Sequence, residues 1–276
     1  MDVFGLPGPN RCRVMGILNV TPDSFSDGGM YLQIAHAIKR GEELAAEGAD
    51  IIDVGGESTR PGARRTSEAD ELERVVPVVQ ELVQAGLHVS IDTMRASVAD
   101  AALRVGAHIV NDVSGGLADP AMSRVVASAD VPYIAMHWRA HSLKMSQQTQ
   151  YDDVCATVRD ELRDRLHALV SEGISADRIV LDPGLGYSKT AQHNWTILSH
   201  LHEFESLGCP MMIGASRKAF LGTALSREGT PPPEARDDAT AAVSALAAAH
   251  GVACVRVHDV RRSRDAVDVA GKWNAG

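Results

Sequence analysis

The sequence predicts a single (β/α)8 barrel, an α/β fold. Three observations support this: eight short apolar segments alternate with helix-period segments, the unit repeats about every 34 residues, and polar residues follow every apolar segment. That repeat length suits one strand plus one helix. An open parallel sheet would gather its ligand groups at one switch point, whereas a barrel presents them on the loops after all its strands. The distribution of polar residues therefore favours the barrel.

The eight predicted strands are rich in apolar residues and lack strict alternation. This pattern is typical of parallel strands that are buried on both faces. Turn-forming residues bound each strand. In chain order the strands are RVMGIL, DIIDVGG, HVSIDT, HIVNDVSG, VPYIAMH, RIVLDPG, MMIGAS and CVRVHD.

Six segments between the strands have the period of an amphipathic helix. They cover residues 33–47, 68–84, 95–104, 151–172, 192–206 and 235–249. A glycine separates each of them from the next strand, where a left-handed backbone most easily ends a helix. These glycines are Gly48, Gly86, Gly106, Gly173, Gly208 and Gly251.

No segment has the composition of a linker between domains. The polar stretch 141–150 and the proline-containing segment 227–234 are predicted to be surface loops. We therefore expect one domain over residues 1–276, with the barrel itself at about 13–270.

The composition narrows the classes of function. The chain has 45% hydrophobic residues, 23% charged residues and a formal net charge of −9, which is typical of a globular protein. No apolar run approaches the roughly 18 residues of a membrane span, and the N-terminus lacks the pattern of a signal peptide. Because an acidic chain without a basic run is unsuited to phosphate backbones, we expect no nucleic acid partner. We expect a cytoplasmic protein that does not bind membranes and acts on a small molecule.

The cysteines indicate neither a disulfide framework nor a zinc site. They are scattered, with no CxxC pair and no His-Cys cluster of metal-ligand spacing. We expect buried free thiols at Cys12, Cys155, Cys209 and Cys254.

Polar side chains from three strand ends are predicted to meet at one mouth of the barrel. Asp92, Asn111 and Asp182 follow the third, fourth and sixth strands. Carboxylates offer acceptors and an amide offers both donors and an acceptor, which suits the edge of a flat heterocycle. The alternative is that these residues only cap the backbone N–H groups of their own loops.

The last strand predicts an anion site. Arg256 and His258 are two residues apart and so share one face of the strand. With Lys218 after the seventh strand they would suit a phosphate, which many barrels bind on these last loops. The alternative is that Arg256 and His258 pair with neighbouring acids, namely Asp237, Asp238 or Asp259.

Two long polar loops follow the first two strands. Their sequences, NVTPDSFSDGG and GGESTRPGA, are rich in turn-forming residues and suit mobile lids. Asn19 could offer an oxygen to Mg²⁺, and Ser58, Thr59 and Arg60 could contact an anion. Ordinary turns are the alternative. His137 and Trp138 after the fifth strand could line the pocket or serve only in packing. GxGxxG, GxxxxGK[ST] and GxSxG motifs are absent.

Seven ordered segments together resemble dihydropteroate synthase of the folate pathway, in its actinobacterial form. They are NVTPDSFSDGG, DVGGESTRPGA, SIDT, IVNDVSGG, LDPGLGYSKT, IGASRK and RVHDV, within about residues 13–270. The resemblance implies a (β/α)8 barrel and a transferase, usually a homodimer. This enzyme joins 4-aminobenzoate to 6-hydroxymethyl-7,8-dihydropterin diphosphate and gives 7,8-dihydropteroate and diphosphate. The family requires Mg²⁺, and sulfonamides compete with 4-aminobenzoate.

The resemblance also implies roles for particular residues. The residues that would bind the pterin are Asp92, Asn111, Asp182 and Lys218. Those that would bind diphosphate are Asn19, Thr59, Arg60, Arg256 and His258, with Asn19 also binding Mg²⁺. The 4-aminobenzoate pocket would contain Phe25, Pro61, Lys218 and Ala219, the last standing where many members of the family have serine. The catalytic set would be Asn19, Asp92, Lys218, Arg256 and His258.

The implied chemistry agrees with these residue types. An arylamine is a neutral nucleophile, so the difficult step is breaking the C–O bond to diphosphate. Mg²⁺ and the cationic side chains would stabilise the departing charge, while the acids tolerate a developing cation in an SN1-like course. Two alternatives stay open: a non-catalytic paralogue that binds a pterin or a protein, and a pterin-dependent methyltransferase.

Overall fold

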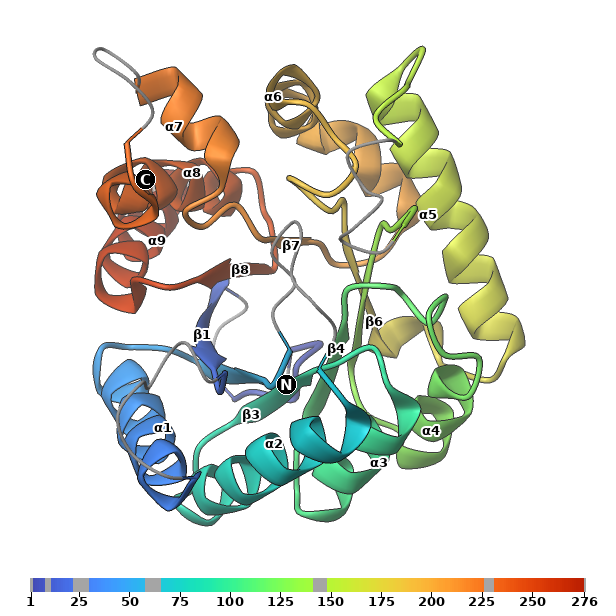
Figure 1. The fold of residues 1–276 in the computed structure, drawn as a ribbon. Coiled ribbons are helices and arrows are strands. Elements are labelled where there is room, and N and C mark those ends of the chain that lie inside the picture. Colours follow the sequence, from blue (N-terminus) through green and yellow to red (C-terminus); the bar gives the residue numbers. More distant parts are fainter. Residues whose placement is uncertain are drawn as a thin grey trace.

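The protein is a closed parallel barrel (Figure 1). The structure is a computed structural model, and it describes residues 2–7, 11–21, 30–57, 66–140, 148–225 and 231–275. Its sheet has eight strands in the order β6-β5-β4-β3-β2-β1-β8-β7. A parallel bridge between Leu181 and Met211 joins the two end strands, so the sheet closes on itself. The predicted (β/α)8 barrel is confirmed.

All eight predicted strands are present. They are β1 (Arg13–Asn19), β2 (Ile51–Gly55), β3 (Val89–Asp92), β4 (Ile109–Asp112), β5 (Tyr133–Met136), β6 (Ile179–Asp182), β7 (Met212–Ile213) and β8 (Cys254–Val257).

Helices form a ring around the strands in Figure 1. The α-helices are α1 (Met30–Ala46), α2 (Glu68–Gln84), α3 (Ala96–Arg104), α4 (Met122–Ala129), α5 (Val154–Ser171), α6 (Ala191–Ser199), α7 (Ala219–Leu225), α8 (Asp237–Ala249) and α9 (Val260–Ala275). Short 3-10 segments are η3 (Ala176–Arg178), η4 (Leu201–Leu207) and η5 (Pro233–Arg236). The six glycines predicted to end helices all have positive φ, between 69° and 105°.

The helix prediction is incomplete in two respects. It omits α4 and α7, which have only 8 and 7 residues, and the polar terminal helix α9. It also joins α6 and η4 into one helix over 192–206, which the structure divides at His200. There the side chains of Ser199 and His200 both bond to the Thr196 carbonyl, at 3.0 and 2.8 Å. These side chains occupy the Thr196 carbonyl, which would otherwise accept a backbone N–H group in the next turn of the helix.

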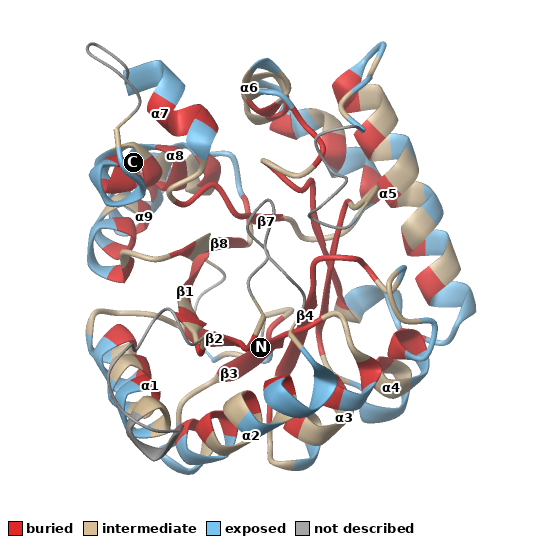
Figure 2. Cartoon of the chain, in the orientation of Figure 1, coloured by how far each residue is buried: buried red, intermediate tan, exposed pale blue. Residues whose placement is uncertain are grey.

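Two apolar clusters hold the barrel together. The larger lies between the strands and the surrounding helices, whose buried faces turn inward in Figure 2. The smaller contains one residue from nearly every strand together with Phe4: Met15, Ile51, Ile109, Ile134, Val180, Met212 and Cys254. Because side chains alternate along a strand, this second cluster marks the inward-facing layer near the N-terminal ends of the strands.

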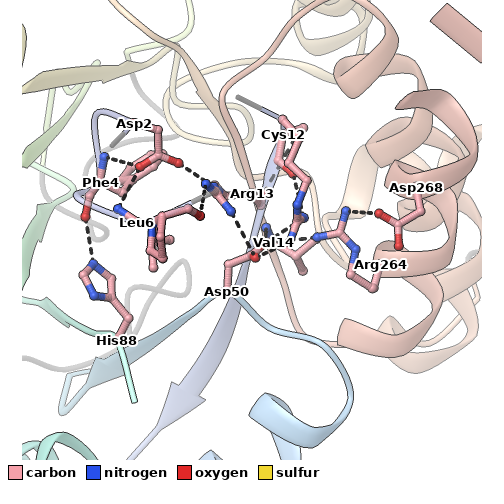
Figure 3. Close-up of polar contacts among 12 residues, drawn as sticks. Asp2, Phe4, Leu6, Cys12, Arg13, Val14, Asp50, His88, Arg264 and Asp268 are labelled. Carbon is pink, nitrogen blue, oxygen red and sulfur yellow. Dashed lines mark hydrogen bonds and ion pairs between the residues drawn. The ribbon is translucent and has the colours of Figure 1, made fainter. Parts of the chain in front are cut away.

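The N-terminal segment covers this end of the barrel (Figure 3). Phe4 is 1% exposed and packs on the inner apolar layer. The Asp2 carboxylate accepts the backbone N–H groups of Phe4 and Leu6 at 3.0 Å each and pairs with Arg13. His88 Nε2 donates to the Phe4 carbonyl at 2.8 Å. Buried packing and satisfied polar groups therefore fix residues 2–7 as a plug.

The described cysteines are free, as predicted. Cys12, Cys155 and Cys254 are buried, whereas Cys209 is only half-buried, so the expectation of burial is wrong for that residue. Among the described helices, none combines the length and the apolar character that crossing a membrane requires.

Removing the plug's aromatic ring should destabilise the fold. We expect Phe4→Ala to lower the free energy of unfolding by about 3–5 kcal/mol, because it opens a cavity in a closed apolar layer. Equilibrium unfolding in urea measures this difference. The control is Leu117→Ala, whose side chain is 51% exposed and should change stability by at most about 0.5 kcal/mol. Equal effects of the two substitutions would contradict the role of Phe4.

Candidate active site

A layer of polar side chains lies directly above the inner apolar layer. Asp53, Asn111, Asp182 and Arg256 each follow by two positions a residue of that layer, so they also face the barrel interior. On β3, Asp92 is paired in register with Asn111 on β4 and Gly55 on β2. The polar residues therefore come together towards the C-terminal ends of the strands, where barrels carry function.

Arg256 is held by two carboxylates. Its Nε donates to Asp53 Oδ2 and its Nη2 to Asp92 Oδ2, both at 2.6 Å. Asp53 is fully buried and Asp92 is 8% exposed. Arg256 thus pairs across the barrel interior, and for this residue the alternative pairing with Asp237, Asp238 or Asp259 is wrong.

This cluster shifts the protonation of its members. Burial raises the pKa of Asp92 to about 7, because Arg256 only partly opposes the loss of solvent while Asp53 and Asp112 add to it. Burial alone would lower the pKa of Arg256, but the charges of Asp53 and Asp92 raise it above its usual value. Arg256 therefore stays cationic, whereas Asp92 changes charge near neutral pH.

Asn111 and Asp182 each keep an acceptor towards the interior. Asn111 Nδ2 donates to Asp53 Oδ2 at 2.9 Å, and its Oδ1 accepts from no described residue. Asp182 Oδ1 accepts the Gly184 N–H at 2.7 Å, which leaves Oδ2 for another donor. Capping of the loop's own backbone thus engages only one of the two oxygens of Asp182. Capping is the main role of Asp112, whose carboxylate accepts the backbone N–H groups of Ser114 and Gly116 and the hydroxyl of Tyr133.

The three residues of the SRK motif have different partners. Ser216 Oγ lies 2.9 Å from His258 Nδ1 and accepts the His258 backbone N–H at 3.0 Å. Arg217 makes two bonds of 2.8 Å to Asp237, with its backbone at φ 58°. Lys218 Nζ donates to the Leu185 carbonyl and lies 4.8 Å from the centre of the Tyr187 ring. Burial lowers the pKa of Lys218 to about 8, opposed by the charge of Asp182.

His258 directly follows β8, and its ring contacts Ser216 after β7. Arg256 lies in β8 and Lys218 follows β7, so the three predicted cationic residues lie in or directly after two neighbouring strands.

Asn19 ends β1, half-buried, and its side chain bonds to no described residue. Among the described residues no group of three or more His, Cys, Asp or Glu side chains could hold a metal by itself. Ala219 begins α7 and is exposed. Five other predicted site residues lie outside the described residues: Phe25, Ser58, Thr59, Arg60 and Pro61.

A second polar cluster, which the sequence analysis did not predict, supports the loop after β6. Lys189 is 8% exposed and donates to His137 Nδ1 at 2.9 Å and to the carbonyls of Gly184 and Tyr187 at 3.2 Å each. His137 Nε2 donates to Glu161 at 2.7 Å. His137 is therefore a partner of the loop that carries Asp182.

Sequence reasoning also missed Asp53. It considered residues at strand ends, whereas Asp53 lies in the middle of β2. The alternation of side chains along a strand could have revealed it, because Asp53 lies two residues after Ile51 and therefore on the same face of β2.

Comparisons with known proteins are consistent with this geometry. Residues 15–258 match the family of pterin binding enzymes. A dihydropteroate synthase from Mycobacterium leprae is 53% identical, covering 95% of this chain and 93% of the relative. The structure of Xanthomonas albilineans dihydropteroate synthase with 4-aminobenzoic acid is 41% identical with a TM-score of 0.89, covering 97% and 94% of the two chains. The Yersinia pestis dihydropteroate synthase with a sulfonamide drug complex is 36% identical with a TM-score of 0.91, covering 99% and 98%.

The environment of His137 predicts its protonation. Burial and the neighbouring charge of Lys189 lower the pKa of His137 to about 4, although Glu161 opposes this shift and Arg139 adds to it. We expect a neutral ring with its proton on Nε2 from pH 8 down to about 5. The unfolded chain protonates this residue at about 6.5, so its contribution to stability should be lost as the pH falls from there to about 4. Nitrogen-15 NMR of the imidazole tests this, and a doubly protonated ring at pH 6 would contradict it.

Proposed function

The chain belongs to the dihydropteroate synthase family, and we propose that the polar layer above the barrel's inner apolar layer is where it carries out that family's reaction. It condenses 6-hydroxymethyl-7,8-dihydropterin diphosphate with 4-aminobenzoate and releases 7,8-dihydropteroate and diphosphate. The enzyme is a transferase of folate biosynthesis. The observation that carries this assignment is one cluster in which acceptors for a heterocycle adjoin cations for an anion.

The acceptors suit the pterin. Asp182 Oδ2 and Asn111 Oδ1 are turned from their protein partners and can accept N–H groups of the ring, and Asp92 extends this edge. Lys218 lies beside the same loop and complements Asp182 electrostatically. A flat ring with alternating donors and acceptors is held in one orientation by such a set.

The cations suit the departing diphosphate. Arg256 uses Nε and Nη2 for Asp53 and Asp92, and its Nη1 donates to no described residue. Arg256 and His258 stabilise the charge that develops on the leaving oxygen. The carboxylates of Asp92 and Asp182 offset positive charge on the pterin methylene, which 4-aminobenzoate then captures in an SN1-like course.

Mg²⁺ fits Asn19 as far as the described residues allow. The Asn19 side chain bonds to no described residue, so its amide oxygen would be available as one ligand of the ion. When bound, Mg²⁺ would neutralise part of the diphosphate charge.

Four residues outside the described part of the chain complete the proposed site. Thr59 and Arg60 would contact diphosphate, and Phe25 and Pro61 would line the 4-aminobenzoate pocket with Lys218 and Ala219. The Yersinia pestis relative forms a complex with a sulfonamide drug, which supports the proposal that such drugs also bind this chain. The exposed methyl group of Ala219 offers this pocket no hydrogen bond.

We also propose a cytoplasmic homodimer. Free thiols at all four cysteines agree with a reducing compartment. Large apolar side chains are exposed on α8 and α9, namely Leu246 (63%), Val269 (66%) and Trp273 (84%). Asn274 donates to the Ala249 carbonyl at 2.8 Å and so brings Trp273 to the end of α8. These residues would lie in the dimer interface.

The interface can be tested through the oligomeric state. Trp273→Glu and Val269→Glu together should shift the mass in sedimentation equilibrium from two chains towards one, because two charges would be buried against apolar side chains. Arg104→Glu on α3 is an exposed control that should leave the mass unchanged. A wild type that sediments as one chain would contradict the dimer.

Catalysis is tested by diphosphate release from the pterin diphosphate, with and without 4-aminobenzoate, Mg²⁺ or a sulfonamide. We expect release that needs both 4-aminobenzoate and Mg²⁺ and is inhibited by the sulfonamide. Asp182→Ala should mainly weaken pterin binding, by about tenfold or more, because it removes a charged acceptor. Arg256→Ala should mainly lower kcat, by about 10²–10³-fold, because it removes a donor to the developing charge.

The same assay separates the alternatives. Tight pterin binding without diphosphate release would indicate a non-catalytic paralogue. Pterin binding that is independent of Mg²⁺ and diphosphate would favour a methyltransferase. Unchanged kinetics in both variants would overturn the assignment of the site.

A further inference from the structure

Asp53 is the most deeply buried charged group of the polar layer. Its exposed fraction is 0%, and its Oδ1 has no hydrogen-bond partner among the described residues. A buried carboxylate oxygen without a donor is unfavourable. Stability alone therefore does not account for an aspartate at this position.

One oxygen of Asp53 serves two functional side chains. Oδ2 accepts from Arg256 Nε at 2.6 Å and from Asn111 Nδ2 at 2.9 Å. These partners belong to β8 and β4, on opposite sides of β2 in the order of strands. Asp53 is thus the point at which the cationic part and the amide part of the site are joined.

The chemistry of a carboxylate fixes the orientation of both partners. An ionised carboxylate only accepts hydrogen bonds, so the Asn111 amide must turn its NH₂ group towards Asp53 and its carbonyl oxygen away. In the same way, Arg256 presents its Nε edge to Asp53 and leaves Nη1 for another acceptor.

Asp92 cannot replace Asp53 in this role. Asp92 bonds only to Nη2 of Arg256, and burial raises its pKa, so its hold on Arg256 is weaker. It is also one of the groups proposed to face the pterin. Asp53, which would touch no ligand, can keep Arg256 in place whether or not Asp92 is charged or bound to the pterin.

We propose that Asp53 is a further positioning residue of the synthase reaction, acting through Arg256 and Asn111 without touching substrate. This inference rests on the proposed function, because the residues that Asp53 orients are those assigned to the diphosphate and the pterin. It makes Asp53 necessary for both turnover and pterin recognition.

The test compares Asp53→Asn with a matched control. Asp53→Asn keeps the shape of the side chain but removes its charge, and if its carbonyl oxygen accepts from Arg256 and Asn111, its NH₂ group is buried without an acceptor among the described residues. We expect kcat for diphosphate release to fall about 10²-fold, as for a misplaced catalytic group, and KM for the pterin diphosphate to rise. The control is Asp50→Asn, immediately before β2, whose carboxylate bonds to Arg264 and Val14 at the plugged end. It should lower thermal stability and leave kcat and KM unchanged.

A double-substitution cycle separates positioning from a structural role. If Asp53 acts through Arg256, Asp53→Asn should lower kcat far less in an Arg256→Ala background than in the wild type. The same fall in both backgrounds would overturn the proposal. So would wild-type kinetics of Asp53→Asn.

The pH profile gives a second readout. Four charged groups act on Asp92: Arg256 on β8, Asp53 on β2, Asp112 on β4 and Glu71 on α2. Removing the negative charge of Asp53 should lower the pKa of Asp92 and move the acid limb of kcat/KM to lower pH, whereas Asp50→Asn should not move it. An unmoved limb in Asp53→Asn would contradict the proposal.

A measurement on the unaltered protein covers the case in which Asp53→Asn does not fold. The Arg256 Nε–H signal in nitrogen-15 NMR, assigned by its loss in Arg256→Lys, should persist at pH 8 with and without Mg²⁺ and inorganic diphosphate. Its disappearance on adding diphosphate would show that Arg256 leaves Asp53, and would overturn the proposal. A wild type that releases no diphosphate would instead count against the proposed function.

Discussion

The site is organised around the guanidinium of Arg256 between the carboxylates of Asp53 and Asp92. Unpaired charges are strongly unfavourable inside a barrel, and removing one partner from a buried pair leaves the other uncompensated. Here β8 supplies the cation while β2 and β3 supply the two carboxylates, so the pairing requires these strands to lie in one sheet around β1. The same pairs that permit burial also leave a donor of Arg256 and an acceptor of Asn111 for ligands. Assembly of this part of the barrel therefore also assembles this part of the site.

The two ends of the barrel divide stability and function between them. At one end Phe4 and the inner apolar layer are sealed, and Asp50 bonds to Arg11, Val14 and Arg264 without facing the site. Towards the other end lies the polar layer, two residues further along the strands. It includes Asp53 Oδ1, which has no hydrogen-bond partner among the described residues. Packing at the plugged end compensates for unfavourable burial at the open end. This division is expected of a barrel whose loops after the strands carry the chemistry.

Much of this arrangement follows from sequence. Eight apolar segments fixed the fold class, and glycine at six helix ends placed the turns. The two-residue spacing of Arg256 and His258 predicts one shared face, and the structure places Arg256 in β8 and His258 directly after it. The sequence could not reveal the partners of Arg256, because Asp53 and Asp92 lie 203 and 164 residues away. Likewise the helix at 192–206 ends early through side chains competing for one carbonyl, a local contact that periodicity does not encode.

The most direct test of this account is a crystal structure with bound 7,8-dihydropteroate. We predict that the pterin ring lies against Asn111 and Asp182, that the Asn111 carbonyl accepts from the ring, and that Arg256 remains bonded to Asp53. A pterin bound elsewhere would contradict the assigned site. Arg256 found away from Asp53 in that complex would contradict the claim that their pairing organises it.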